Sequence, residues 1–311
     1  MAADVRVICL RPQDRKFWPA MRSRDITDLL VLAAVWGGSF LFMRMGVPEF
    51  GPAALIALRV GLAALALLPL LLWQHKLRVL LRHWKAILVV GTFNATLPFI
   101  LYAYAAQQLG AGFLSIANAV TPMWGAAIGW IWLGDRLPAS RVAGMLLGLA
   151  GIVVLVWDKF HFDAGGSGLA VLAALLAPVC YGIAANCTKR YLAGVDALTN
   201  ATGSMLASAL TLLPFAIWTW PHEPVSFQAW SATLLLALAC TAFAYVLFFR
   251  LIASVGPTGA ISVTFLVPIF GVFWGAFLLD EIVTPNMLAG AAVVLAGTAL
   301  ALGLVKLPAL R

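Results

Sequence analysis

Polar and aromatic side chains recur at helical spacing inside the long apolar runs of this sequence. Asn94, Pro98 and Tyr102 follow one another four residues apart, and Thr241 and Tyr245 repeat that spacing. Residues four apart share one face of a helix. Such a face binds organic molecules through hydrogen bonds, ring stacking and cation–π contacts. The candidate ligand-binding residues are Trp36, Asn94, Tyr102, Asn118, Tyr181, Asn186, Tyr245, Thr264 and Arg59.

Each of these residues also has a structural explanation. Polar groups in apolar helices hydrogen-bond to neighbouring helices, and aromatic rings gather at membrane interfaces. Arg59 is the one strong cation well inside an apolar run, seven residues after Pro52. It therefore lies about 10 Å along a helix. Three roles for Arg59 stay open: attracting an anionic group such as a carboxylate, snorkelling to the nearby interface, or bracing helix ends through their carbonyls.

Other chemistry finds little support in the residue pattern. The acids Asp28, Glu49, Asp135, Asp280 and Glu281 all fall at the ends of apolar runs, so no intramembrane proton relay is expected. These acids instead suit pairing with Arg44 or Arg250 across the ends of helices. The four histidines lie in loops on both faces, and the four cysteines have no metal-ligand spacing. The sequence therefore predicts no catalytic residues, no metal site and no cofactor.

Composition decides the broad class of protein. The chain is 63% hydrophobic and 10% charged, with a mean hydropathy of +0.99, whereas soluble domains are about 25% charged. This composition predicts a polytopic membrane protein. The net charge of +8 also fits a nucleic-acid-binding protein. However, the basic residues cluster beside apolar runs, where they signal membrane topology, so no nucleic-acid partner is expected.

Apolar runs long enough to cross a bilayer predict the architecture. A helical span needs about 20 apolar residues. The ten predicted spans are 27–45, 52–73, 84–107, 111–133, 138–157, 168–189, 197–219, 228–252, 257–279 and 286–305. With both termini in the cytoplasm, seventeen basic residues lie on that side and only Arg44 and Lys159 on the other. We expect residues 1–26 to be a basic cytoplasmic tail, because they lack the apolar core of a cleaved signal peptide.

The two halves of the chain repeat one another. At an offset of 146 residues, 110–151 matches 256–297 at ten of 42 positions, six of them glycine or proline. At an offset of 145, Trp36-Gly37 matches Tyr181-Gly182. Each repeat, 27–157 and 168–305, holds five spans, and this odd number gives the repeats opposite orientations. The fold class is therefore all-α, with ten transmembrane helices in two inverted five-helix repeats.

The repeated helix breakers have two interpretations. Pro122 and Pro268 each remove a backbone donor and free a carbonyl near Asn118 and Thr264, which favours bends that line or gate a cavity over static kinks. The pairs Gly125/Gly129 and Gly271/Gly275 favour close helix packing.

These motifs, taken in order, resemble the EamA-type ten-helix carriers of the drug/metabolite transporter superfamily. The resemblance covers about 27–305 and rests on order and spacing, since no single fragment is specific. Its fragments are WGGSF at 36–40, Pro52 to Arg59, TP at 121–122 with LGDRL at 133–137, VP at 267–268 with LLDEIV at 278–283, and the glycine-rich 144–155. Asp135 departs from the glutamate usual in the family, whereas Glu281 fits. The resemblance implies a central cavity from helices 1–4 and 6–9, with helices 5 and 10 outside.

We therefore expect a multi-pass protein of the bacterial inner membrane that moves a small organic metabolite by alternating access. The resemblance implies amino acids, related metabolites or drugs, usually exported. Two alternatives stay open: a non-transporting membrane partner or scaffold subunit, and a membrane enzyme acting on lipid intermediates. The expected partners are a small-molecule substrate and the lipid bilayer. A homodimer is left open.

Overall fold

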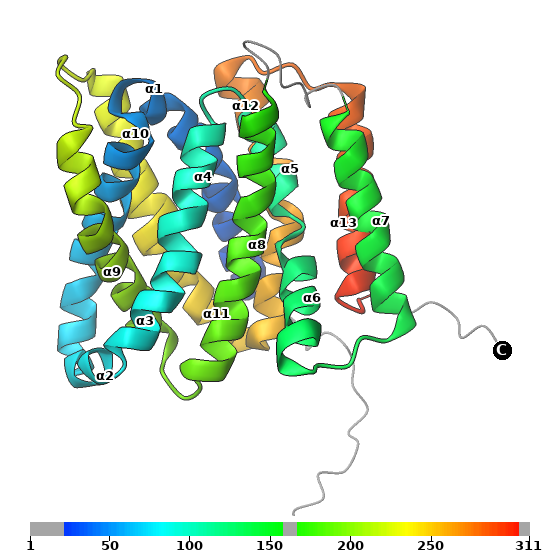
Figure 1. Ribbon diagram of the computed structural model, residues 1–311, viewed down its shortest axis with the longest axis horizontal. Coiled ribbons are helices and arrows are strands. Elements are labelled where there is room, and N and C mark those ends of the chain that lie inside the picture. Colours follow the sequence, from blue (N-terminus) through cyan, green and yellow to red (C-terminus); the bar gives the residue numbers. More distant parts are fainter. Residues whose placement is uncertain (1–21, 158–166, 305–311) are drawn as a thin grey trace, which may run out of the picture.

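The computed structural model describes residues 22–157 and 167–304, and within them all regular structure is helical (Figure 1). Eight helices are long and apolar enough to cross a membrane; one is bent into two spans, and a shorter apolar helix completes ten spans in this part of the chain. The predicted all-α, ten-span inverted-repeat fold is confirmed. Most of the predicted basic tail, together with Lys159, lies outside the described residues.

The helices follow the predicted spans closely. The first half consists of α1 (Ser23–Trp73), the short α2 (Leu77–Arg82), α3 (Trp84–Gly91), the π-helix η1 (Thr92–Thr96), α4 (Leu97–Ala105), α5 (Ala111–Asn118), α6 (Thr121–Leu133) and α7 (Ala139–Val156). The second half consists of α8 (Gly168–Tyr191), α9 (Ala197–Trp218), α10 (Phe227–Ala237), the π-helix η2 (Leu238–Phe243), α11 (Ala244–Ile261), α12 (Val263–Leu279) and α13 (Pro285–Ala301). In Figure 1, loops 106–110 and 280–284 lie at the upper end of the bundle, and loops 134–138 and 192–196 at the lower end.

Two glycines reverse the chain between spans without a separate loop. Gly51 within α1 has φ 70° and ψ 165°, and Gly256 within α11 has φ 77° and ψ 169°. Residues with a Cβ adopt a positive φ only with strain, so glycine suits both positions. The first span consequently runs from residue 23 to the Gly51 turn, several residues longer at each end than predicted.

Both halves carry a π-helical turn at repeat-related positions. Thr92 begins η1 and Leu238 begins η2, an offset of 146 residues. Each wider turn lies midway along its span and changes the direction in which the following side chains point. The Thr241 hydroxyl donates to the carbonyl of Leu236 at 2.8 Å within the second π-turn. The turns thus re-aim the helix faces that carry Asn94 and Tyr245, and the sequence periodicity did not reveal them.

Helices α7 and α13 pack together at one edge of the bundle, on the right of Figure 1. Glycines line their contact: a Cβ added to Gly144 would meet backbone atoms of Ala301 and Gly297, and one added to Gly151 would meet Val294 N at 2.6 Å. Lipid supplies no hydrophobic drive between helices, so such close approach is what stabilises the pair. The outside position expected for these two helices is confirmed.

Replacing Gly144 by Ala should destabilise the fold. The added methyl meets backbone atoms of α13, which cannot rotate away, so we expect a loss of about 1–3 kcal/mol, the usual cost of overpacking. The matched control is Gly61→Ala, because a Cβ there has nothing within 4 Å among the described residues. Thermal unfolding in detergent should show a lower Tm for Gly144→Ala alone. Equal Tm values would contradict the packing argument.

Candidate functional site

Two hydrogen bonds join the predicted polar residues across the centre of the bundle. Asn94 in η1 donates to the Tyr245 hydroxyl in α11 at 3.2 Å. The Tyr102 hydroxyl in α4 donates to the Asn118 side chain at the end of α5 at 3.1 Å. Four residues predicted from the sequence therefore meet in two pairs, each linking different spans.

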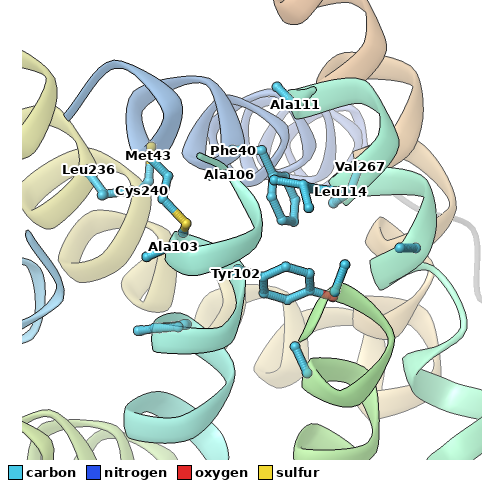
Figure 2. Close-up of a cluster of buried hydrophobic side chains, with 14 of the residues drawn as sticks. Phe40, Met43, Tyr102, Ala103, Ala106, Ala111, Leu114, Leu236, Cys240 and Val267 are labelled. Carbon is cyan, nitrogen blue, oxygen red and sulfur yellow. The ribbon is translucent and has the colours of Figure 1, made fainter. Parts of the chain in front are cut away.

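Aromatic rings surround these pairs. The Tyr102 ring meets Phe40 edge-on (Figure 2), with 5.3 Å between the ring centroids. The centroid of the Tyr181 ring lies 6.5 Å from that of Tyr102. Trp36 packs against Phe248 at 5.2 Å, and Tyr245 stacks on Phe249 at 5.7 Å. Phe40, Phe248 and Phe249 are not among the residues predicted from the sequence. Helical spacing could have found them, because Phe40 follows Trp36 by four residues, and Phe248 and Phe249 follow Tyr245 by three and four.

Arg59 lies inside the bundle and not at an interface. Its residue is 4% exposed, its Nε donates to the Thr241 hydroxyl at 3.0 Å, and its guanidinium carbon lies 3.7 Å from the centre of the Phe99 ring. The alternative in which Arg59 snorkels to the interface is wrong, because the side chain points inward to η2 and α4.

Two other candidates make backbone contacts away from this centre. Buried Asn186 donates to the carbonyls of Gly125 and Gly182, both at 2.9 Å, and so ties α8 to α6. Thr264 donates to the carbonyl of Ile261 at 2.8 Å. Asn186 is thus used in helix packing, and Thr264 does not reproduce the contact of Asn118, its counterpart in the repeat.

The two prolines act differently in the two halves. Pro122 lies in the first turn of α6, directly after a break at 119–120, whereas α12 continues through Pro268 as one helix. Hydroxyls satisfy the carbonyls freed at the break: Thr121 donates to Asn118 O at 2.7 Å and Thr298 donates to Ala119 O at 3.1 Å. In the first half the freed carbonyls therefore already have protein donors, whereas a gating role of Pro122 and Pro268 stays a prediction.

Repeat-related glycines bring two helix pairs into close contact. A Cβ at Gly37 in α1 would meet Gly271 N in α12 at 2.8 Å. A Cβ at Gly182 in α8 would meet Gly125 N in α6 at 3.0 Å. These positions correspond under the repeat, so the same close approach joins α1 to α12 and α8 to α6.

A third repeat-related contact exists in one half only. In the upper half of the bundle, α5 packs on α12, and a Cβ at Gly271 would collide with the Ser115 side chain. The corresponding positions in the lower half are Gly125 and Ile261. A Cβ at Gly125 would have nothing within 4 Å among the described residues, and Ile261 is 36% exposed. Helices α5 and α12 thus meet in the upper half, whereas the equivalent segments around Ile261 and Gly125 are apart in the lower half.

The ion pairs show the same asymmetry. Glu281 lies 3.4 Å from Arg44 and accepts the backbone N–H groups of Ala111 and Gly112 at 2.8 and 3.2 Å, so it fastens α5 to the end of α12. The repeat-related pair, Asp135 with Lys189 at 2.7 Å, is exposed at the lower end. The predicted pairing of acids with Arg44 and Arg250 is confirmed, since Arg250 lies 3.0 Å from Asp28.

Gly129 and Gly275 leave room for these acids. A Cβ at Gly275 would lie 2.5 Å from the Glu281 carboxylate, and one at Gly129 would lie 2.8 Å from that of Asp135. The backbone N–H groups of the same two acids donate to the carbonyls of the same two glycines. The pairs Gly125/Gly129 and Gly271/Gly275 therefore combine two functions, helix approach at the first glycine and accommodation of a carboxylate at the second.

The comparisons with known proteins agree with this architecture. The profile of the EamA-like transporter family matches residues 26–157 and 168–303, so the chain belongs to this family. A solved crystal structure aligns with a TM-score of 0.63 at 20% identity, covering 90% of this chain and 97% of the other, which supports the fold. The protein is thus a multi-pass membrane transporter of the drug/metabolite transporter superfamily.

Curated relatives carry transporter names. The chain is 26% identical to the uncharacterized transporter YvbV of Bacillus subtilis, over 86% of this chain and 88% of that protein. It is 26% identical to a probable terminal-alkyne amino-acid exporter of Streptantibioticus cattleyicolor, over 89% and 93%. It is 24% identical to a probable amino-acid metabolite efflux pump of Escherichia coli, over 89% and 94%.

Neutralising the two repeat-related acids should have unequal effects on stability. The Glu281 side chain is 12% exposed and accepts two backbone N–H groups, so Glu281→Ala should cost about 1–3 kcal/mol. The Asp135 side chain is 46% exposed, so Asp135→Ala should cost about 0–1 kcal/mol. Thermal unfolding of the two variants compares them directly. A larger loss for Asp135→Ala would contradict the asymmetry.

Proposed function

We propose that this protein is a secondary transporter that exports a small organic metabolite across the bacterial inner membrane by alternating access. The observation that carries the proposal is the asymmetry between two contacts that the inverted repeat relates. The Ser115–Gly271 contact closes the upper half, and its counterpart at Gly125 and Ile261 is open. Two inverted halves exchange such roles when a carrier changes the side to which its site opens.

The positive-inside rule gives the open end its side of the membrane. Described basic residues gather at the lower end, in the loops and helix ends after Trp73, Leu133 and Thr188. Among the described spans, Arg44 is the basic residue near the upper end. This distribution supports a cytoplasmic position for the lower end, where Gly125 and Ile261 are apart, and an exporter takes its substrate from that side.

The exchange is expected to preserve some contacts and swap others. The glycine contacts of α1 with α12 and of α8 with α6 exist in both halves, so these pairs move as units. Rotation of one unit against the other separates Ser115 from Gly271 and brings Ile261 onto Gly125. Glu281 then leaves the end of α5. The breaks at 119–120 and at Ser262 lie where α5 meets α6 and α11 meets α12, and serve as hinges.

The substrate is expected to bind at the hydrogen-bonded and aromatic centre. Trp36, Asn94, Asn118, Tyr181 and Tyr245 are half-buried, although they lie midway along apolar spans. Half-buried polar and ring atoms at this depth suit an organic molecule. Amino-acid exporters among the relatives make amino acids and related metabolites the first compounds to test.

Transport in proteoliposomes tests the proposal. Purified protein in lipid vesicles should exchange at least one radiolabelled amino acid, related metabolite or drug from a broad panel, and empty vesicles should not. Asn118→Ala should lower that transport, because Asn118 accepts from Tyr102 at the centre of the bundle. A panel without any transported compound would overturn the assignment as a carrier.

Gly125→Leu should separate folding from transport. The Cβ of the added side chain meets no described atom within 4 Å in this conformation, so we expect stability to be retained. In the opposite conformation the same side chain blocks the approach of Ile261, and a clash of only about 1.4 kcal/mol lowers that population tenfold. We expect a Tm near that of the wild type with transport reduced at least about tenfold.

Gly61→Leu is the matched control, because its Cβ also meets nothing within 4 Å among the described residues and Gly61 lies outside both contacts. It should keep both stability and transport. If Gly125→Leu transports as well as Gly61→Leu does, the proposed exchange of contacts is wrong.

A further inference from the structure

Arg59 is a cation held deep in a membrane span without an acidic partner. It follows the Gly51 turn by eight residues, about 12 Å along the helix, and is 4% exposed. No acidic side chain within residues 22–157 and 167–304 lies within ion-pair distance of it. A charge in this position is unfavourable unless something compensates it.

The protein uses only part of the hydrogen-bonding capacity of Arg59. A guanidinium has five N–H donors, and in the described part of the chain only Nε has an acceptor, the Thr241 hydroxyl at 3.0 Å. That hydroxyl is held in turn by its own bond to Leu236 O, and the Phe99 ring lies 3.7 Å from the guanidinium carbon. The guanidinium group is therefore fixed in orientation, and its four terminal N–H groups have no acceptor among the described residues.

The surroundings add donors and no competing charge. Tyr181, Cys240 and Tyr245 lie close enough to interact electrostatically with Arg59, and all are neutral side chains. Because the Tyr245 oxygen accepts from Asn94 at 3.2 Å, its own proton remains free to donate. Arg59 in α1 and Tyr245 in α11 thus each carry donors without an acceptor among the described residues.

Arg59 has no counterpart in the second repeat, unlike several residues that pack the helices together. Several packing features occur twice: the contacts of Gly37 with Gly271 and of Gly182 with Gly125, the π-turns, and the pairs of Glu281 and Asp135 with a cation. The position that corresponds to Arg59 at an offset of 145 is Ser204, and the one that corresponds to Thr241 at 146 is Ala95. A five-helix repeat thus folds without a buried cation at this position. The presence of Arg59 in the first repeat alone therefore points to a ligand.

Building on the proposed function, we propose that Arg59 binds the carboxylate of the transported substrate. A guanidinium fork matches the two oxygens of a carboxylate, and one negative charge balances one positive charge. A phosphate dianion would leave a net charge in the span, because no second cation among the described residues interacts with Arg59. The Tyr245 hydroxyl donates to the same carboxylate, and the rings of Tyr181 and Tyr102 face the rest of the molecule.

Ligand-induced thermal stabilisation of the purified protein tests this inference. The probes are the standard amino acids and simple carboxylic acids, each beside its own carboxamide and decarboxylated amine, with chloride and inorganic phosphate as further arms. We expect carboxylates to stabilise the wild type and the matched amides to bind at least about tenfold more weakly. Equal affinity for acid and amide, or stabilisation by chloride or phosphate alone, would overturn the inference.

Variants of Arg59 distinguish a role in carboxylate binding from a role in stabilising the fold. Arg59→Gln should lose the carboxylate response at least about tenfold, and Arg59→Lys should recover part of it, because the charge returns without the fork. Arg82→Gln, on an exposed turn of α2, should bind as the wild type does. If Arg59→Gln lowers the Tm but leaves carboxylate affinity intact, Arg59 is a brace and the inference is wrong.

Two results keep the test decisive. If Arg59→Gln does not fold, the comparison of acid with amide on the wild type still decides the matter. Transport of only carboxylate-free compounds would overturn the role of Arg59 and leave the proposed transporter function standing. If no compound is transported at all, the proposed transporter function itself is wrong.

Discussion

Close approach between helices at glycine is the interaction on which the rest of this structure depends. Apolar side chains gain nothing by leaving lipid for another apolar surface, so helices associate where small residues let backbones meet. Gly37 on Gly271 and Gly182 on Gly125 supply such contacts once in each repeat, and the glycines of α7 and α13 join the outer pair. The bundle is therefore assembled from paired helices, and this pairing leaves the pairs free to move as units.

The irregular parts of the helices are placed where the protein can satisfy them. In a bilayer an unpaired backbone carbonyl is costly, and non-helical backbone survives only where protein or water supplies a partner. Thr121 and Thr298 donate to the carbonyls exposed at the break before Pro122. The π-turns η1 and η2 stand at equivalent positions and turn Asn94 and Tyr245 toward one another. The binding centre results from these departures from regular helix.

Much of the fold was readable from the sequence, and less of the site. Apolar length and basic residues predicted ten spans, and the recurrence of glycine and proline predicted the inverted repeat, because both follow from the chemistry of the bilayer. Four polar candidates met as predicted, but Asn186 proved to be a packing residue and Phe40, Phe248 and Phe249 were missed. Spacing along one helix identifies a face, but not the helix that the face meets.

The sequence by itself determined the class of protein, the number of spans and the symmetry between halves. Only the tertiary structure decided that the symmetry is broken, with α5 closed on α12 and Gly125 left open, and that Arg59 points inward without an acid. The physical reason is that hydropathy and helix breakers act locally, residue by residue. Which of two equivalent contacts is formed depends instead on how the two packed halves tilt against each other, and the repeat encodes both contacts alike.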